Sequence, residues 1–315
     1  MKQFINTLIR ILLTVLILAV IFAKIDFQST ISVISNSNFV FILLSFMTLF
    51  IFSYILALRW QMVLKLYGFN VSIFRSFKIY MIGLFFGNFL PSTVGTDVIR
   101  GIYISDKDKR ISDVISSILI ERWIGLLGIL FYIIIVPMIF FSRVELKYFL
   151  PISITGLLLS AVFFIAISND KVFLFFSGVF SKIKFLKLGE KMNSLFASLR
   201  LIKDHKKQLV INLLLSFMIQ VVFVFTNYFI VLSQGLSISL TDLIIYIPFI
   251  SLISMIPITI NGLGLREWAY MTFFSSAMKE ETVALSITFF LVTVIFSIMG
   301  GIFFLTEKKN IKEKI

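Results

Sequence analysis

The residues of this sequence that could bind a charged group lie between apolar segments. Arg266 and Glu267 end the stretch PITINGLGLRE, which begins at Pro257 and separates two strongly apolar runs. An arginine at membrane depth costs about 2.5–3.5 kcal/mol on insertion scales, so it needs a partner or a water-lined site. Because the guanidinium fork matches the oxygens of phosphate, Arg266 indicates recognition of an anion.

A second stretch, PSTVGTDVIR, repeats this pattern from Pro91 to Arg100. The proline and the arginine are nine positions apart in both stretches, and each arginine has an acidic residue nearby. The other related positions are Thr93 and Thr259, Gly95 with Gly262 and Gly264, and Asp97 with Glu267. Proline ends a helix and glycine lets a ligand approach the backbone, so each stretch predicts a broken helix.

Three predicted membrane spans separate the two stretches, which places them in opposite orientations. Paired interrupted helices in inverted halves are typical of transporters whose substrate site lies at the repeat interface. Irregular backbone at membrane depth also survives only where protein buries it or water lines it. The alternative is a chance match between helices that contain proline and glycine, with arginines that reach outward to the interface as anchors.

Glu121 and Arg122 form a third charged pair, about two turns into an apolar span. Adjacent residues on a helix do not face each other, so each of the two is expected to have another partner. We expect both to line the same anion site, and a neutralised pair near the interface is the alternative. Asn88, before the first proline, and Asn261, within the second stretch, are further candidate ligand donors.

The composition indicates a membrane protein. The 315 residues are 59% hydrophobic and 14% charged, whereas soluble domains carry about 25% charged residues. The absence of cysteine excludes disulfides and a thiolate nucleophile. The single histidine, His205, lies in a lysine-rich loop, so no metal site is predicted. The sequence has no nucleotide-binding glycine loop, so we expect no cofactor and no ATP-driven step.

Six apolar segments are long enough, at about 20 residues, to cross a bilayer. They are residues 6–23, 39–58, 113–138, 148–167, 208–232 and 283–305. The interrupted motifs at 80–100 and 243–267 are expected to re-enter on the side from which they came. This topology places 23 of the 29 Lys and Arg residues on one side, including those of 59–78, and four on the other. By the positive-inside rule, both termini are then cytoplasmic.

The predicted fold is therefore an all-α polytopic membrane protein with a single integral domain, residues 1–315, in the cell membrane. The net charge of +13 follows from the cytoplasmic loops, so nucleic acid is not expected as a partner. The loop 169–207 is basic, and its apolar residues recur at helical spacing. This loop predicts an amphipathic helix on the inner leaflet.

Three motifs of the sequence resemble the flippase-like family that includes the transmembrane region of lysylphosphatidylglycerol synthases. They are NFLPSTVGTDVIR at 88–100, Glu121-Arg122, and IPITINGLGLRE at 256–267. In the first motif, Val94-Gly95-Thr96-Asp97 stands where the family pattern has two adjacent glycines before the acid. The resemblance covers nearly the whole chain. We expect no soluble aminoacyl-transferring domain, so the resemblance implies the lipid-moving half of the synthases and not lipid aminoacylation.

We expect a flippase or scramblase that moves an anionic phospholipid or a lipid-linked sugar phosphate through an arginine-lined cavity, and no enzymatic activity. The predicted substrate-binding residues are Arg100, Arg266, Arg122, Asp97, Glu121, Glu267, Asn261, Asn88, Thr93 and Thr259, and the residues predicted to shape the loops are Pro91, Gly95, Pro257, Gly262 and Gly264. Two alternatives stay open. One is a membrane glycosyl- or phospho-transferase with Asp97 or Glu267 as base, and the other is a non-transporting partner of enzymes that assemble lipid-linked glycans or lipids.

Overall fold

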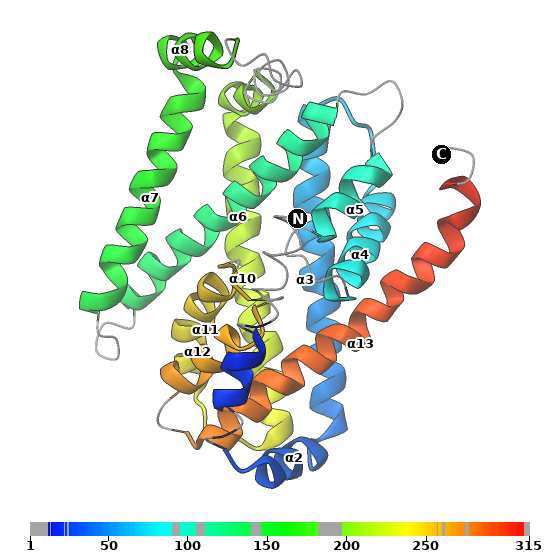
Figure 1. Ribbon diagram of the computed structural model, residues 1–315, viewed down its shortest axis with the longest axis vertical. Coiled ribbons are helices and arrows are strands. Elements are labelled where there is room, and N and C mark those ends of the chain that lie inside the picture. The colour runs from blue at the N-terminus through cyan, green and yellow to red at the C-terminus, as the bar shows by residue number, and fades with distance from the viewer. Residues whose placement is uncertain are drawn as a thin grey trace. The chain divides into compact units, whose positions relative to one another are not determined.

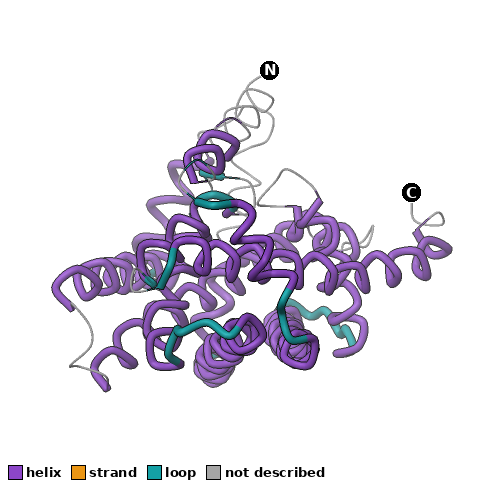
Figure 2. The backbone as a smooth tube through the Cα atoms, turned by 90° about the horizontal axis from the view of Figure 1, so that it is seen from below, coloured by secondary structure: helices purple, strands orange, loops and turns teal. Residues whose placement is uncertain are grey.

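The fold is helical throughout the part of the chain that the structure describes. The structure is a computed structural model, and it describes residues 12, 14–21, 23, 25–89, 95–104, 111–139, 146–181, 197–256, 258–259, 262–274 and 277–311. Every regular element within these ranges is a helix, and the loops between them are short (Figures 1 and 2). The prediction of an all-α protein is confirmed for these residues.

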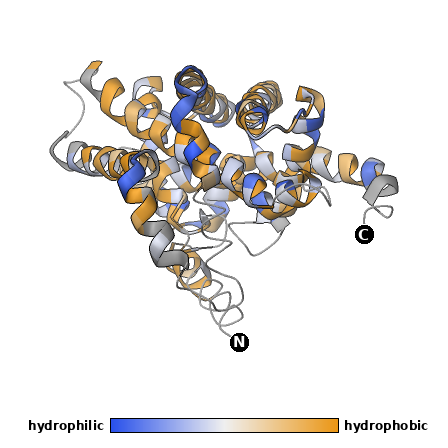
Figure 3. Cartoon of the chain, turned by 90° about the horizontal axis from the view of Figure 1, so that it is seen from above, coloured by the Kyte–Doolittle hydropathy of each residue, from blue (hydrophilic) through white to orange (hydrophobic). Residues whose placement is uncertain are grey.

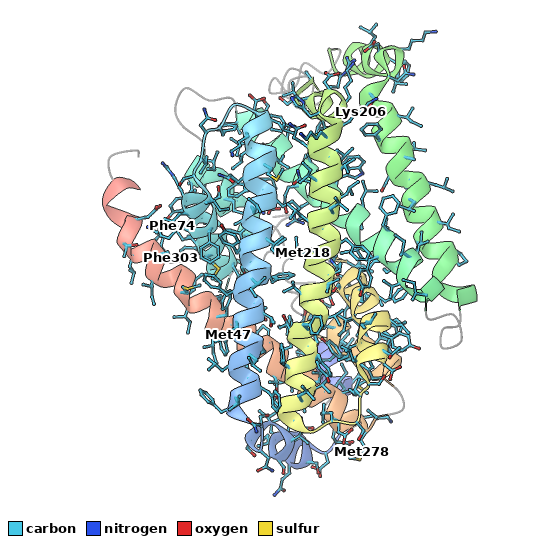
Figure 4. All side chains as sticks on the ribbon, turned by 180° about the vertical axis from the view of Figure 1, so that it is seen from behind. Met47, Phe74, Lys206, Met218, Met278 and Phe303 are labelled. Atoms are coloured by element: carbon cyan, nitrogen blue, oxygen red, sulfur yellow. The ribbon has the colours of Figure 1, made fainter. Side chains whose placement is uncertain are left out.

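Four of the described helices are long and apolar enough to cross a membrane. They are α3 (Phe39–Leu66), α6 (Ile111–Ile139), α10 (Lys206–Gln234) and α13 (Lys279–Ile311). Apolar side chains stay exposed along them, including Met47 of α3 and Met218 of α10 (Figure 4). Hydrophobic residues follow most of the helices in Figure 3. Exposure of so much apolar surface to water is unfavourable and rare in soluble proteins, so these faces are suited to contact with lipid.

These four helices cover four of the six predicted spans. A fifth predicted span, 148–167, falls in α7 (Leu146–Ser168), which has Pro151 near its start. The first predicted span, 6–23, is described only in part, and residues 12 and 14–21 of it are helical. The number of crossing segments and the cytoplasmic position of both termini therefore stay predictions.

The chain divides into two compact units. The first comprises Met1–Tyr54, Lys78–Ile99 and Ile219–Ile315, and the second comprises Ile55–Phe77 and Arg100–Met218. The prediction of a single integral membrane domain stays a prediction, and each unit is described by itself.

The core of the first unit is built around two short helices, α11 (Leu240–Ser254) and α12 (Leu265–Phe273). α12 packs between α11 and α13, and α2 (Phe27–Ser35) also packs on α13 (Figure 1). The buried apolar side chains of this core include Leu243, Tyr270, Phe274 and Phe289. The chain caps these helices locally, since the side chains of Asp26 and Ser239 accept hydrogen bonds from the first turns of α2 and α11.

Helix α4 (Ile73–Phe89) approaches α13 very closely within the first unit. A Cβ atom at Gly300 would overlap the carbonyl oxygen of Met81, and one at Gly301 would lie 2.9 Å from the Phe85 ring. Small residues therefore allow backbone contact between these helices, as in many membrane proteins. Further along the same crossing, Lys78 pairs with Glu307 at 3.9 Å.

The second unit packs α6 against α7, and α7 against α8 (Asp170–Ser181) and the 3₁₀ helix η3 (Arg200–Asp204). The ring of Trp123 on α6 stacks on Phe164 of α7, with 5.7 Å between ring centroids. Asp170 at the start of α8 binds Arg200 and lies 3.6 Å from Lys203. Leu174 and Phe175 of α8 are exposed, while the remaining predicted amphipathic segment, 182–196, lies outside the described residues.

The two predicted motifs differ in how much of each the structure describes. In the second, α11 ends at Ser254, α12 begins at Leu265, and the described residues between them are not α-helical, so this interruption is confirmed. In the first, α4 (Ile73–Phe89) and α5 (Gly95–Ile104) flank residues 90–94, which lie outside the described residues, so this interruption stays a prediction. Re-entry of either motif on the same side of the membrane also stays a prediction. Residues Pro91, Thr93, Pro257 and Asn261 of the two breaks lie outside the described residues.

Glycine makes the second break possible. Gly262 and Gly264 have φ angles of 72° and 85°, a conformation that other residues rarely adopt. A Cβ atom at Gly264 would also lie 2.9 Å from Cγ2 of Ile17. The turn therefore needs glycine at 264 for two reasons, backbone conformation and space.

Candidate functional site

A buried carboxylate, Glu121 of α6, binds two arginines in the second unit. Its Oε1 atom accepts hydrogen bonds from Nε of Arg59 at 3.1 Å and from Nη2 of the same guanidinium. Its Oε2 atom accepts from Nη1 and Nη2 of Arg100 at 3.3 and 3.2 Å. Each carboxylate oxygen thus has its own arginine. We call Arg59, Arg100 and Glu121 the Glu121 cluster.

Arg59 of this cluster is fixed from several sides. Its Nη1 atom donates to Oγ of Ser216 on α10 at 2.9 Å, and Ser216 in turn donates to the carbonyl of Asn212. A Cβ atom at Gly125 would lie 3.1 Å from Nη2 and 3.2 Å from Nη1 of Arg59. The absence of a side chain at Gly125, one turn after Glu121 on α6, leaves the space that the guanidinium occupies.

Arg100 lies in a different environment. Its Cζ atom is 4.2 Å from the centroid of the Trp60 ring, a cation–π distance. Trp60 is fully buried, and its Nε1–H has no hydrogen-bond partner among the described residues. Asp97 precedes Arg100 by one turn on α5 and is also buried. Arg100 is thus held between a carboxylate and an aromatic face.

The second buried carboxylate, Glu267 of α12, lies in the first unit. Its Oε1 atom accepts from Nη2 of Arg266 at 2.9 Å and from Oγ of Ser286 at 2.7 Å. The Ser286 hydroxyl also accepts from Nε of Arg266 at 3.0 Å, so one serine bridges both charged groups. The Oε2 atom accepts from the backbone N–H of Gly264. We call Arg266, Glu267 and Ser286 the Glu267 cluster.

The Glu267 carboxylate therefore occupies the N-terminal end of α12, where free backbone N–H groups favour an anion. The rings of Phe289 and Phe290 each lie 5.5 Å from Cζ of Arg266 and enclose it. Tyr270, one turn further along α12, donates its hydroxyl to Oδ1 of Asn227 on α10. This donation ties α12 to a long apolar helix.

The structure brings some of the predicted site residues together and separates others. Arg100 and Glu121 meet, and so do Arg266 and Glu267. Arg122 is exposed although its neighbour Glu121 is buried, as expected for adjacent residues on one helix. Thr259 is fully buried, and its hydroxyl has no hydrogen-bond partner among the described residues.

The remaining predicted residues occupy the two breaks and their flanks. Asn88 is half-buried near the end of α4, Gly95 is buried at the start of α5, and Gly262 and Gly264 form the turn before α12. Pro91, Thr93, Pro257 and Asn261 cannot be placed because they lie outside the described residues.

Arg59 was missed by the sequence analysis. The first long span was predicted to end at residue 58, which placed Arg59 in a cytoplasmic loop, and this placement is wrong. Helix α3 continues to Leu66, and Arg59 is buried within it. Two signals pointed to the residue: it lies in the apolar run ILALRWQMVL, and Glu121 required a partner other than Arg122.

Guanidinium–carboxylate pairs of this kind can exchange one anion for another. A phosphate group offers the same bidentate geometry as a carboxylate, so it can replace a glutamate on an arginine. No group of three or more metal-ligating side chains occurs within the described ranges. The buried guanidinium groups are of a kind that pairs with oxyanions.

Comparison with known proteins identifies the family. The family model described as the lysylphosphatidylglycerol synthase TM region matches residues 7–301. The chain belongs to this family. The expected resemblance is thus confirmed, and both arginine clusters lie within the matched region.

Similar proteins support the same assignment. The chain is 26% identical to a UPF0104 membrane protein of Pyrococcus horikoshii, over 90% of this chain and 91% of that protein. It is 24% identical to a UPF0104 membrane protein of Methanocaldococcus jannaschii, over 97% of this chain and 96% of that protein. Both similar proteins are thus named as membrane proteins, and the matches cover nearly their full length.

Proposed function

We propose that this protein moves an anionic lipid, either a phospholipid or a lipid-linked sugar phosphate, between the leaflets of the cell membrane. The observation that carries the proposal is the pair of buried arginines, Arg100 and Arg266, each on a short helix and each held by a glutamate. Family membership and four long apolar helices support a role at membrane lipids.

The chemistry of the proposal is anion exchange. In the empty protein, Glu121 and Glu267 neutralise the arginines, because a buried unpaired charge is costly. An incoming headgroup phosphate replaces the glutamate on one guanidinium through charge-assisted hydrogen bonds. The acyl or prenyl tail stays in the bilayer during this exchange. In this proposal, two segments re-enter the membrane and both termini are cytoplasmic. Transport is driven by an ion gradient, by the membrane potential or by the concentration gradient of the lipid.

The proposal also holds that the protein is not an enzyme. Glu267, one of the two bases named for a transferase, is tied to Arg266 in the described structure, which makes it a poor general base. Two alternatives give the buried arginines and glutamates another role. The protein would be a transferase that acts on a lipid carrier, or a partner of lipid-linked glycan assembly that moves no lipid.

Proteoliposomes that contain only this protein and a fluorescently labelled anionic phospholipid test the proposal. We expect movement of the label between leaflets, and loss of that movement when Arg266 is replaced by alanine. Arg75→Ala is the matched control, since Arg75 is an exposed arginine at the start of α4. Covalent change of the lipid would favour the transferase, and an intact, unmoved lipid would favour the non-transporting partner.

The variant must also be folded for this result to count. Arg266→Lys keeps the charge but loses the planar fork, so it tests phosphate recognition with less disturbance of the buried cluster. Normal lipid movement in folded Arg266→Ala and Arg266→Lys variants would contradict the proposed role of this arginine.

A further inference from the structure

We propose that Arg59 is a positioning residue: it is the permanent counter-ion of Glu121, and it allows a phosphate oxyanion to bind Arg100 without leaving a buried carboxylate unpaired. This inference rests on the proposed function, in that the oxyanion is the phosphate of the lipid that the protein binds. It assigns a role to a residue that lies in neither of the two repeated motifs.

The two carboxylate oxygens of Glu121 bind different arginines in this arrangement. Oε1 binds Arg59 alone, and Oε2 binds Arg100 alone. A ligand that takes Arg100 displaces only Oε2, because the Arg59 bonds to Oε1 do not involve the exchanged group. Glu121 thus keeps a full ion pair throughout the exchange.

Arg59 is anchored strongly enough to stay in place. Ser216 accepts from its Nη1 atom, and the gap at Gly125 receives its guanidinium. Arg100, in contrast, belongs to α5, a helix of ten residues. The fixed partner therefore belongs to a long helix, and the exchangeable partner belongs to a short one.

The aromatic residue beside Arg100 also carries a buried donor without an acceptor among the described residues. The Trp60 indole stacks on Arg100, is fully buried, and carries an N–H with no acceptor among the described residues. Buried donors are normally hydrogen-bonded, so an unpaired one requires an explanation. A phosphate oxygen accepts from both guanidinium and indole N–H groups, whereas a cationic or apolar ligand would satisfy neither.

A binding experiment on the purified full-length protein in detergent tests the inference. The probes are dihexanoyl phosphatidylglycerol, a soluble anionic phosphodiester lipid, and inorganic phosphate, and isothermal titration calorimetry measures their affinities. Binding of either probe with loss in Arg100→Lys supports an oxyanion site at Arg100. Preference for the lipid identifies a headgroup as the source, and preference for phosphate identifies the free ion. If neither probe binds to the folded protein, the inference is wrong.

A double-mutant cycle isolates the role of Arg59. We expect Arg59→Gln to weaken binding of the probe at least about tenfold, because Arg100 is then the sole partner of Glu121. In a Glu121→Gln background the same substitution is expected to change affinity by less than about threefold. Arg75→Gln, at an exposed arginine of the same unit, is the matched control and is expected to bind as the unaltered protein does. Equal losses in both backgrounds would overturn the inference, as would no loss in either.

Two milder variants keep the test valid if Arg59→Gln does not fold. Gly125→Ala retains Arg59 but fills the space beside its guanidinium, so it should weaken binding in the same direction by a smaller factor. Arg59→Lys retains the positive charge and should recover part of the lost affinity. Failure of lipid transport in a protein that binds the probe would refute the proposed function and leave this inference standing, since the calorimetric measurement does not depend on transport.

Discussion

The Glu121 and Glu267 clusters bury the same kind of ion pair but build it differently. Glu121 collects its partners from distant parts of the sequence, 62 residues away at Arg59 and 21 at Arg100. Glu267 takes its partners from its own helix end, Gly264 and Arg266, and from one serine 19 residues away. The first cluster therefore depends on tertiary packing of several helices, whereas the second is largely a property of one turn.

The difference bears on how each carboxylate would release its arginine in the proposed exchange. Glu121 pairs with two guanidinium groups, whereas the cation that Glu267 contacts within the described ranges is Arg266. If Arg266 turns to a ligand, Glu267 retains a serine hydroxyl and a backbone N–H. The two clusters are thus expected to respond differently to the same substitutions.

The largest expected effect is the loss of the shared carboxylate. Glu121→Ala leaves two buried guanidiniums without their common partner, and breaking a buried pair costs about 3–5 kcal/mol. Glu267→Ala strands one guanidinium and is expected to cost less. Thermal unfolding of the two variants in detergent measures the order, with Asp204→Ala, at an exposed carboxylate, as the control. Equal losses would remove the distinction between the clusters.

The turn before α12 gives the next largest effect. Gly264→Ala places a side chain at a φ of 85° and against Ile17, and an unfavourable backbone conformation costs about 1–3 kcal/mol. We expect lower thermal stability and a weakened Glu267 cluster, since a shift of the backbone at 264 would move the N–H that donates to Glu267. Gly178→Ala, on α8 with no described atom within 4 Å of the added Cβ, is the matched control and should be tolerated. A stable Gly264→Ala variant would show that the local turn does not build the cluster.

The serines sharpen the comparison further. Ser286 bonds to both members of its ion pair, while Ser216 bonds to Arg59 but not to Glu121, and its own hydroxyl donates to a backbone carbonyl. A buried group left without its partner costs about 1–3 kcal/mol, so Ser286→Ala should destabilise more than Ser216→Ala. Unfolding in denaturant measures both values. The reverse order would mean that the Glu121 cluster depends more on its serine than its bonds suggest.

The smallest effect on stability is expected for an exposed carboxylate that binds two cations. Asp170 also meets two cations, and hydrogen bonding from Arg200, with the charges of Lys203 and Arg200, lowers the pKa of Asp170 below its ordinary 3.8. A lowered folded-state pKa contributes stability that is full above pH 3.8 and is lost as the pH falls through the lowered value. Asp170→Asn should therefore reduce the unfolding temperature slightly at pH 7 and not at all at strongly acidic pH. A loss as large as that of Glu121→Ala would show that burial does not separate the two cases.

The sequence predicted the local features and missed the tertiary ones. The helix break before α12 and the Arg266–Glu267 motif follow from proline, glycine and charge within about ten residues, which is the range of local backbone chemistry. Arg59 was missed because charge alone marked the end of a span, although a buried partner can hold an arginine inside a helix. That partner, Glu121, lies 62 residues away, and only packing of α3 on α6 reveals it.

Glu121 and Arg122 show how far helix periodicity alone predicts the contacts of adjacent side chains. Helical geometry predicted that the two side chains would diverge, and they do, since one is buried and the other exposed. The same rule did not anticipate contact between Arg266 and Glu267. At the first turn of α12, Ser286 from α13 draws both side chains to one point, which helix periodicity alone does not describe.

The stack of Trp60 on Arg100 gives this protein an optical probe of its own. The chain has three tryptophans, and the other two are Trp123, stacked on Phe164, and Trp268, which is half-exposed. Replacing those two by phenylalanine leaves the indole at Arg100 as the sole tryptophan emitter. Its fluorescence responds to the neighbouring charge, so occupancy of Arg100 becomes visible in real time and without an attached dye.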